Sequence, residues 1–499
     1  MRIWIPGVAL SLSVAVLVSS VATAQNRPNS FPDWPSERPP LPLPAREVKF
    51  PPYEIRTLAN GMRVLTILHH EQPVVTMRLI VGAGAAEDPQ GKAGLSNLLG
   101  NLLDQGTATR SAQEIADQID TIGGALGTGS GSDLSFANIV VMKDSFGTGM
   151  ELLADVVRNP KFDAEEIDRQ KQQAMSTLQV NATDPDYVAS ALIDRLIYGF
   201  HPYGLPGNGT PETLAGITRD DLVAFHKRYF VPNNMILAVV GDTTTDEAFG
   251  MVEKVFGPWP RAELTIPKPI DPPPPTRRIV VVDKPDAVQT EIRVGQLAIS
   301  RNHKDYLAWD LAVKILGGEG ANRLHRVLRS QRGLTYGASA ETQAMKQAGD
   351  YVAETDTRTD TTGEVLRLTV DEFARLQRNR VYEPELKDAQ AFLAGTFPLT
   401  IETPNEIATQ VLNAVFYDLP LSDLATFRER VQAVTPDDIQ RVSQAYIRPD
   451  RLSIVLVGNA RAFVQQLRAV GFTDFEVIPI ENLDLMAGGL QRTGRASVR

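Results

Sequence analysis

Two segments of the chain, 217 residues apart, carry the same pattern. TRDDLVAFHKRYFVPNNMILAVVGD covers residues 218–242, and TPDDIQRVSQAYIRPDRLSIVLVGN covers residues 435–459. They align without a gap, and each has a Thr N-cap with acidic residues in the first turn of a helix, then a proline turn and an apolar strand that ends at glycine. Because a duplication of this length is far too long for a solenoid repeat, the chain is expected to fold as two similar lobes.

Strands and helices are mixed within each predicted lobe. The runs RVLTIL at 63–68 and VVTMRLIV at 74–81 have the composition of strands. Leucines recur at helical spacing from Leu95 to Leu103, which predicts an amphipathic helix there. Further helices are expected at 163–180, 185–198, 306–316 and 361–378. The predicted fold class is α+β, with two duplicated lobes of mixed strands and helices.

Proline-rich stretches mark the boundaries of the lobes. Consecutive prolines favour an extended backbone and end both helices and strand ladders. We therefore expect a signal peptide at 1–24, a proline-rich arm at 25–52, an N-terminal lobe at 53–257, a proline-rich linker at 258–278 and a C-terminal lobe at 279–499.

The first of these segments has the layout of a secretory signal peptide. One cation, Arg2, precedes an apolar run that ends in the small residues ATA, the last of which is Ala24. An uncleaved membrane anchor is the alternative, because 5–24 has about the ~20 residues needed to cross a bilayer. Cleavage after Ala24 predicts an exported, periplasmic protein without stable membrane insertion.

Charge and composition argue against several functional classes. The chain has 50 basic and 60 acidic residues, a net charge of −10, and no block of consecutive cations, so nucleic-acid binding is not expected. It has no Cys, which removes disulfides, thiol nucleophiles and Cys-ligated zinc or iron–sulfur sites. A metal site would need His and carboxylates, and there are only six His.

Several motifs occur in a specific order between about Tyr53 and Pro479. They are TLANGMRVLTI, AGLSNLLGNLLDQGT, RSAQEIADQIDTIGGALGTGSGSD, HPYGLPGNGTPETLAGITRDDL, the two repeat copies, and ILGGEGANRLHRVLRSQRGLTYGASAE. In this order they resemble the pitrilysin/insulinase family of zinc peptidases, which includes two-lobe periplasmic members. The resemblance implies a mitochondrial-processing-peptidase-like fold.

Active members of that family carry H-x-x-E-H on the first helix, where the two His bind zinc and the Glu is the general base. The resemblance places Asn97 and Asn101 at the His positions and Gly100 at the Glu position, and Thr177 stands where the family has a third ligand, a Glu. Amides and a hydroxyl are poor zinc ligands, and glycine cannot take a proton from water. The resemblance therefore implies that this chain binds no metal or other cofactor, and that Asn97 and Asn101 are an ordinary polar stripe.

The six His offer no replacement for this site. His69 and His70 are adjacent on a predicted strand and are expected to point to opposite faces. The others lack a partner at the spacing of metal ligands: His201, His226, His303 and His325.

The C-terminal lobe keeps a different part of the family's active site. In the family, an Arg and a Tyr seven residues later reach the zinc site, where the Arg holds substrate backbone and the Tyr hydroxyl stabilises the tetrahedral oxyanion. LRSQRGLTY supplies Arg329 and Tyr336 at that spacing. Without the resemblance, they would be read as a helix-end Arg and a core Tyr. The glycines before the pair are expected to form a turn into its helix, and they lack the Lys and Ser/Thr of a phosphate loop: Gly317, Gly318 and Gly320.

The resemblance implies a non-catalytic subunit of a heterodimeric zinc-dependent peptidase, inactive alone, that binds substrate and stabilises the oxyanion. The expected partner is a homologous subunit that carries H-x-x-E-H and holds the zinc, and the expected substrate is a peptide bound as an added strand. Two alternatives remain open at this stage. One is an inert scaffold, like the core subunits of respiratory complexes that share this fold, and the other is a peptide-binding or holdase protein that acts alone.

Overall fold

The computed structural model describes residues 49–318 and 322–492, which belong to one of the two units into which the chain divides. The expected signal peptide and nearly all of the proline-rich arm lie outside the described residues. Within the described ranges, we find no helix that combines the length and the apolar character needed to cross a membrane.

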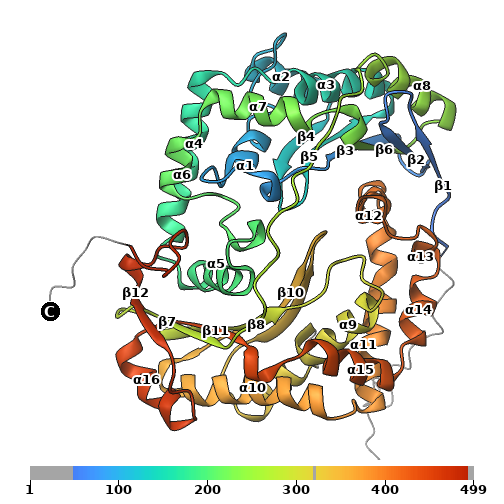
Figure 1. The fold of residues 1–499 in the computed structure, drawn as a ribbon. Coiled ribbons are helices and arrows are strands. Elements are labelled where there is room, and N and C mark those ends of the chain that lie inside the picture. Colours follow the sequence, from blue (N-terminus) through green and yellow to red (C-terminus); the bar gives the residue numbers. More distant parts are fainter. Residues whose placement is uncertain (1–48, 319–321, 493–499) are drawn as a thin grey trace, which may run out of the picture. The chain divides into compact units, whose positions relative to one another are not determined.

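Two six-stranded sheets form the frame of the fold (Figure 1). The strands of the first sheet are, in spatial order, β1 (Tyr53–Thr57), β2 (Arg63–Leu68), β6 (Met235–Gly241), β3 (Val74–Val81), β5 (Ser135–Met142) and β4 (Ala125–Ser130). The strands of the second are β12 (Glu476–Pro479), β7 (Arg278–Asp283), β11 (Ser453–Gly458), β8 (Gln289–Leu297), β10 (Gly349–Arg358) and β9 (Ala338–Ala344).

Five strands of one sheet correspond in order and direction to five of the other. The pairs β2–β6 and β7–β11 are parallel, and the ladders that follow them toward β4 and β9 are antiparallel. Only the outermost strand differs, because β1 is antiparallel to β2 whereas β12 is parallel to β7. The predicted α+β fold with two duplicated lobes is confirmed.

The helices also follow the duplication. Those encoded in the first half are α1 (Leu95–Gly100), α2 (Ala112–Thr121), α3 (Phe146–Arg158), α4 (Ala164–Asn181), α5 (Pro185–Tyr198), α6 (Pro211–Gly216), α7 (Arg219–Tyr229) and α8 (Thr245–Phe256). Those of the second half are α9 (Tyr306–Val313), α10 (Thr362–Arg378), α11 (Glu383–Thr396), α12 (Pro404–Phe416), α13 (Ser422–Ala425), α14 (Phe427–Ala433), α15 (Pro436–Tyr446) and α16 (Ala460–Ala469). No helix or strand occurs between α8 and β7, where the linker was predicted.

The two repeat copies fold as the sequence predicts. Thr218 and Thr435 are the N-caps of α7 and α15, and each side chain accepts a hydrogen bond from the N–H three residues later. The strands β6 and β11 follow and are buried along their whole length.

The helix predicted from the leucine spacing is shorter than the run of leucines from Leu95 to Leu103. Helix α1 ends at Gly100, and the N–H of Leu102 bonds to the carbonyl of Leu99 in a tighter turn. This turn still buries Leu102 and Leu103, so burial of these leucines does not require the helix to continue.

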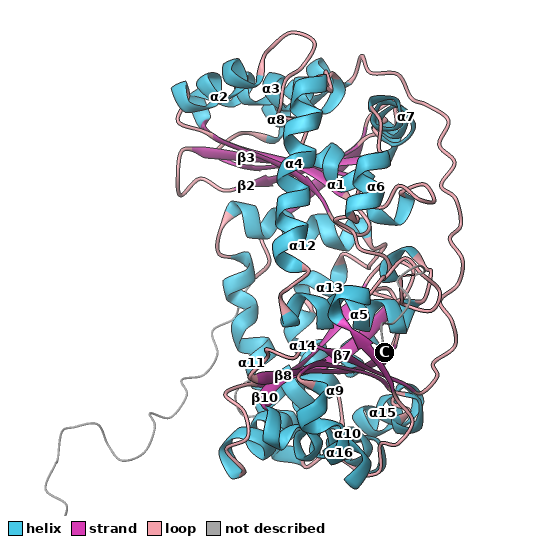
Figure 2. Ribbon diagram, turned by 90° about the vertical axis from the view of Figure 1, so that its left-hand side faces the viewer, coloured by secondary structure: helices cyan, strands magenta, loops and turns pink. Residues whose placement is uncertain are grey.

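Each sheet is covered on one face by a helix from the other half of the sequence. Helix α5 packs on β8 and β11 of the second sheet, and α12 packs on β3 and β6 of the first. Leu192 and Ile193 of α5 share a core with Val455, whereas Ile407 and Val411 of α12 belong to a core with strands of the first sheet. Figure 2 shows α12 beneath the first sheet and α5 above the second. The linker therefore divides the sequence into halves but does not divide the hydrophobic cores.

Helix α5 also brings two buried acids together. Asp194 lies near Asp350 of β10, and burial and their mutual repulsion raise the pKa of Asp194 well above its usual range. Burial raises the pKa of Asp350 to about 7. The Asp350 Oδ2 and the hydroxyl of Tyr198 are buried without a hydrogen-bond partner among the described residues. Burial outweighs the interactions with Tyr198 and with the Gln343 backbone that lower the pKa of Asp350, so the folded state favours the protonated form of this carboxyl group.

A raised pKa in the folded state makes stability depend on pH. The folded protein holds the Asp350 proton more tightly than the unfolded chain does. The free energy of unfolding therefore has its full value at low pH and falls as the pH rises from about 4 through about 7. The loss is about 1.4 kcal/mol for each unit of difference between the folded and unfolded pKa. Asp350→Asn should remove this loss and raise the midpoint of urea denaturation at pH 8 but not at pH 4. Asp360→Asn, at an exposed surface pair with Arg358, is the control and should change neither midpoint. A lower midpoint for Asp350→Asn at pH 8 would contradict this account.

Candidate functional site

Helix α1 is positioned by a buried carboxylate that precedes it. Asp88 accepts hydrogen bonds from the N–H groups of Gly94, at 2.9 Å, and Ser96, at 2.8 Å, which satisfies donors that the first turn of a helix leaves free. Gly94 adopts φ +93°, a conformation that favours glycine. Burial raises the pKa of Asp88 to about 7 although these hydrogen bonds lower it. Sequence reasoning missed Asp88, because its distance of six residues from Gly94 matches no ordinary capping pattern.

The three residues that the resemblance places at zinc-ligand positions lie together in a small pocket between α1 and α4. The pocket has a volume of about 180 Å³ and is lined by Asn97, Asn101 and Thr177 together with other neutral side chains, among them Gln170, Gln173, Asn181 and Asn208. Asn101 Nδ2 donates to Asn97 Oδ1 at 3.2 Å, and the Thr177 hydroxyl donates to the carbonyl of Gln173 in its own helix at 3.1 Å. The three side chains share one pocket, but none of them is a usual zinc ligand.

These residues do not fit zinc. The donor set is two carboxamides and one hydroxyl, and no carboxylate, imidazole or thiolate lines the pocket. Across residues 49–318 and 322–492, no three His, Cys, Asp or Glu residues lie close enough to hold a metal ion. No step of a reaction can therefore be assigned to a metal held by this pocket.

Gly100, at the general-base position, has no room for a side chain. A Cβ on Gly100 would lie 2.6 Å from the carbonyl carbon of Gly129 and 2.8 Å from the nitrogen of Ser130, both in the backbone of edge strand β4. Gly317 lies 217 residues later, the offset of the repeat, and its Cβ would lie 2.2 Å from the nitrogen of Ala340 in edge strand β9. At this position the first lobe packs its helix against its edge strand as the second lobe does.

The predicted turn before the Arg–Tyr pair is helical. Gly317 and Gly318 belong to a π-helical segment, Lys314–Gly318, that continues α9, and Gly320 lies outside the described residues. A glycine is needed at 317 because the helix approaches β9 so closely, and this reason cannot be read from the sequence.

The His residues serve local structure. His69 and His70 lie beyond the end of β2, not on a strand, and His70 Nδ1 is 2.7 Å from Asp242 Oδ1. His226 bonds to the carbonyl of Val157 at 2.8 Å. His201 and His303 accept hydrogen bonds from backbone N–H groups two residues later, and His325 lines the pocket of the Arg–Tyr pair.

Arg329 and Tyr336 are brought together by a chain reversal. Arg329 lies in the π-helical segment His325–Gln331, and Gly333 then turns the chain back at φ +62°. Arg329 Nη1 donates to the main-chain carbonyl of Tyr336 at 2.7 Å. The guanidinium thereby fixes the backbone that presents the tyrosine ring.

The loop of Tyr336 is further held by β10. The hydroxyl of Thr357 donates to the carbonyl of Leu334 at 2.7 Å, and that of Thr355 donates to the carbonyl of Gly337 at 2.8 Å. Tyr336 itself is 82% exposed, and its hydroxyl makes no hydrogen bond to any other described residue. It is therefore not a core tyrosine, and a rigid loop presents its phenol to solvent.

The pocket around the pair has a volume of about 430 Å³ and is mainly polar. Arg293 of β8 lies in its floor, almost fully buried, and forms ion pairs with Asp186 of α5 and with Glu291, the latter at 3.4 Å. Burial raises the pKa of Glu291 to about 7, although Arg293 lowers it. No residue of this pocket lines the amide pocket beside α1, so the structure gathers the predicted site residues into two separate groups.

Comparisons with known proteins agree with this architecture. Residues 63–210 match the sequence model described as Insulinase (Peptidase family M16), and residues 216–393 match that of the Peptidase M16 inactive domain. An uncharacterized zinc protease of Mycobacterium tuberculosis is 25% identical over 422 residues, which cover 83% of this chain and 95% of the relative. The uncharacterized zinc protease YmxG of Bacillus subtilis is 25% identical over 353 residues, 70% of this chain and 84% of the relative.

Solved structures show the same fold. A peptidase M16 inactive domain from Pseudomonas fluorescens is similar with a TM-score of 0.77 and 29% identity, over 81% of this chain and 98% of that one. A protease from Helicobacter pylori has a TM-score of 0.76 at 20% identity, over 82% and 100% of the two chains, and shows the fold alone. The fold defines a two-lobe protein of the M16 peptidase type. The chain belongs to the pitrilysin/insulinase family, peptidase family M16. These findings are consistent with a non-catalytic member.

The close contact at Gly100 leads to a stability prediction. Gly100→Ala should destabilise the fold by about 1 to 3 kcal/mol, because the added methyl group meets backbone that cannot move without disturbing β4. Gly250→Ala is the matched control, since Gly250 lies inside α8 with open space around its Cβ position and the substitution should stabilise by about 0.5 to 1 kcal/mol. Guanidinium denaturation of both variants measures the difference. Wild-type stability for Gly100→Ala would mean that the helix is free to move away from β4.

Proposed function

We propose that this chain is the non-catalytic subunit of a heterodimeric zinc-dependent peptidase that acts on peptides. The observation that carries the proposal is Tyr336, whose exposed phenol is presented by a loop fixed through Arg329, Thr355 and Thr357. Exposure of an aromatic side chain on a rigid loop has no structural benefit to the isolated chain. It suits a group that acts in a site completed by another molecule.

In this proposal Tyr336 donates a hydrogen bond to the oxyanion that forms on the scissile carbonyl in the partner's active site. Donors aimed at developing negative charge act mainly in the transition state. Arg329 contributes indirectly, because one of its nitrogens holds the Tyr336 carbonyl, and its other donors remain available for substrate carbonyls or a carboxylate.

The substrate is proposed to bind as an added strand. Strand β9 is the outermost strand of the second sheet and pairs only with β10, so its outer edge is free to bind an extended peptide within the described part of the chain. Tyr336 lies two residues before β9 begins. A peptide aligned on this edge would pass the phenol at a fixed register.

The partner is proposed to be a homologous subunit that carries H-x-x-E-H and holds the zinc, since the pocket beside α1 contains no suitable ligands. The chain is further proposed to act in the periplasm after cleavage of the segment that ends at Ala24. An inert scaffold and a peptide-binding protein that acts alone are the competing candidates. The fixed loop of Tyr336 favours a catalytic complex, because neither alternative needs a transition-state donor.

The first test concerns assembly. The chain should co-purify with a second M16 protein that carries H-x-x-E-H, and light scattering should give the mass of a one-to-one complex. A structure of that complex should show an interface larger than about 1,600 Å². Elemental analysis should find one zinc for each pair and none bound stoichiometrically by this chain alone. Recovery of the chain only as a monomer or a dimer of itself, without such a partner, would count against the proposal.

The second test concerns catalysis. Tyr336→Phe should lower the kcat of the assembled complex about 10²- to 10³-fold and leave KM and assembly nearly unchanged, because the lost hydrogen bond forms chiefly in the transition state. Tyr382→Phe, which alters another strongly exposed tyrosine, is the matched control and should turn over normally. Arg329→Ala should both raise KM and lower kcat, because it also releases the Tyr336 carbonyl. Full activity of an assembled Tyr336→Phe complex would favour the scaffold.

A further inference from the structure

A further cavity of the described structure lies away from both groups of site residues. It has a volume of about 550 Å³ and lies between the start of α9 and the helices α11 to α14. Its walls are largely apolar and include Leu393, Phe397 and Phe427, the last two stacked with ring centroids 4.7 Å apart. A cavity of this size, with apolar surface and several polar and charged side chains in its wall, is typical of a site for a small molecule.

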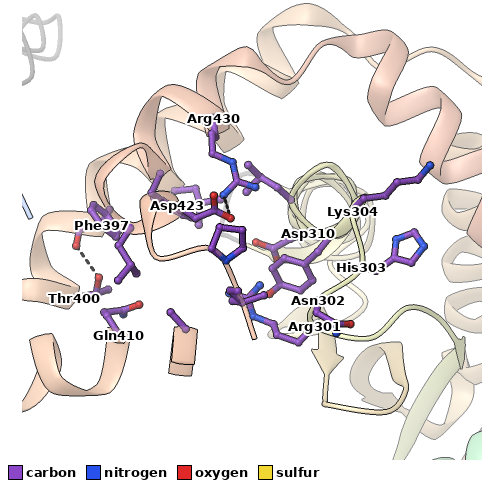
Figure 3. Close-up of a pocket in the computed structure, with 18 of the residues that line it drawn as sticks. Arg301, Asn302, His303, Lys304, Asp310, Phe397, Thr400, Gln410, Asp423 and Arg430 are labelled. Atoms are coloured by element: carbon purple, nitrogen blue, oxygen red, sulfur yellow. Dashed lines mark hydrogen bonds and ion pairs between the residues drawn. The ribbon is translucent and has the colours of Figure 1, made fainter. Parts of the chain in front are cut away.

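Two opposite charges face this cavity without a partner. Asp310 of α9 makes no hydrogen bond or ion pair within residues 49–318 and 322–492 through its carboxylate, and Figure 3 shows it directed into the cavity. Arg301 stacks its guanidinium on the ring of Tyr306, with Cζ 3.9 Å from the ring centroid, and forms no ion pair with the described residues. Stacking covers one face of a guanidinium and leaves its N–H groups free to donate.

The other charges at the cavity are already compensated or directed elsewhere. Asp423 and Arg430 form an ion pair with each other, and the side chain of Lys304 points away from Asp310 (Figure 3). Burial raises the pKa of Asp310, even though Lys314 and Arg301 lower it. The carboxylate is thus poorly solvated and incompletely neutralised, and a cation close to it would stabilise its charged form.

We propose that this cavity binds a small zwitterion with an apolar side chain, namely a free apolar amino acid or a dipeptide. The ammonium group would pair with Asp310, the carboxylate would accept hydrogen bonds from Arg301, and the side chain would lie against Leu393, Phe397 and Phe427. This assignment does not depend on the proposed peptidase role.

A zwitterion fits better than an ion of either sign. A simple cation would satisfy Asp310 but would be repelled by Arg301, and a simple anion would meet the opposite difficulty. A ligand with both charges satisfies both groups, and its apolar portion removes aromatic and aliphatic surface from water. Gln410 of α12, which lines the same cavity and makes no hydrogen bond to other described residues through its amide, offers a further donor and acceptor.

The test uses isothermal titration of the full mature chain with L-leucine and with leucyl-leucine. At least one of them should bind saturably with one site per chain below millimolar concentration. N-acetyl-L-leucine lacks the ammonium, L-leucinamide lacks the carboxylate and glycine lacks the side chain, so each should bind at least tenfold more weakly than L-leucine. Absence of saturation by both probes up to about 10 mM, or binding of the acetyl or the amide derivative as tight as that of L-leucine, would overturn the proposal.

Variants of the two charged residues locate the ligand. Asp310→Asn and Arg301→Gln should each weaken binding at least tenfold, and melting temperatures close to wild type would confirm that both variants are folded. Lys304→Gln is the matched control, because this cation lines the same cavity but points away from Asp310. It should bind within about twofold of wild type. Unchanged affinity in both folded variants would place the ligand elsewhere, and the comparison of leucine derivatives on the wild-type chain remains decisive if a variant does not fold.

Discussion

The exchange of helices α5 and α12 is the constraint on which the rest of this structure depends. A six-stranded mixed sheet has two faces to cover, and in each sheet one face is covered by helices that follow nearby in sequence. The other face is covered by a helix encoded beyond the linker. This arrangement fixes the two sheets to each other through continuous hydrophobic cores, and it places Asp186 of α5 in the floor of the pocket that holds Arg329 and Tyr336.

Local patterns were sufficient to predict the elements but not their partners. The Thr caps at 218 and 435, the apolar strands after them and the helices at 163–180 and 185–198 all depend on neighbours within a few residues, and they fold as expected. The position of α5 on the second sheet depends on residues nearly a hundred or more positions away. The spacing of apolar residues in α5 is that of any amphipathic helix, and nothing in this spacing identifies the sheet against which the helix packs.

The sequence predicted which residues belong to the candidate site, but it did not predict what surrounds them. Spacing and motif order identified Asn97, Asn101 and Thr177, and these do share a pocket. From the sequence, Gly100 was interpreted only as the loss of a general base. The structure adds a steric reason for a glycine at this position, because the backbone of β4 lies within contact distance of it. That reason involves residues about thirty positions later, so no local signal reveals it. Similarly, the hydrogen bond from Arg329 to the carbonyl of Tyr336 became visible only with the loop in place.

The exchange of helices α5 and α12 also determines when each sheet can bury both of its faces during synthesis. The last strand of the first sheet ends at Gly241, but the helix that covers its second face ends at Phe416, about 175 residues later. A ribosome adds about 5 to 20 residues per second, so the apolar surface formed by Leu65, Ile80 and Val240 stays uncovered for roughly 9 to 35 seconds after the strands have emerged. Until α12 is made, the first sheet cannot bury its second face, so completion of the first half of the protein waits for synthesis of the second half.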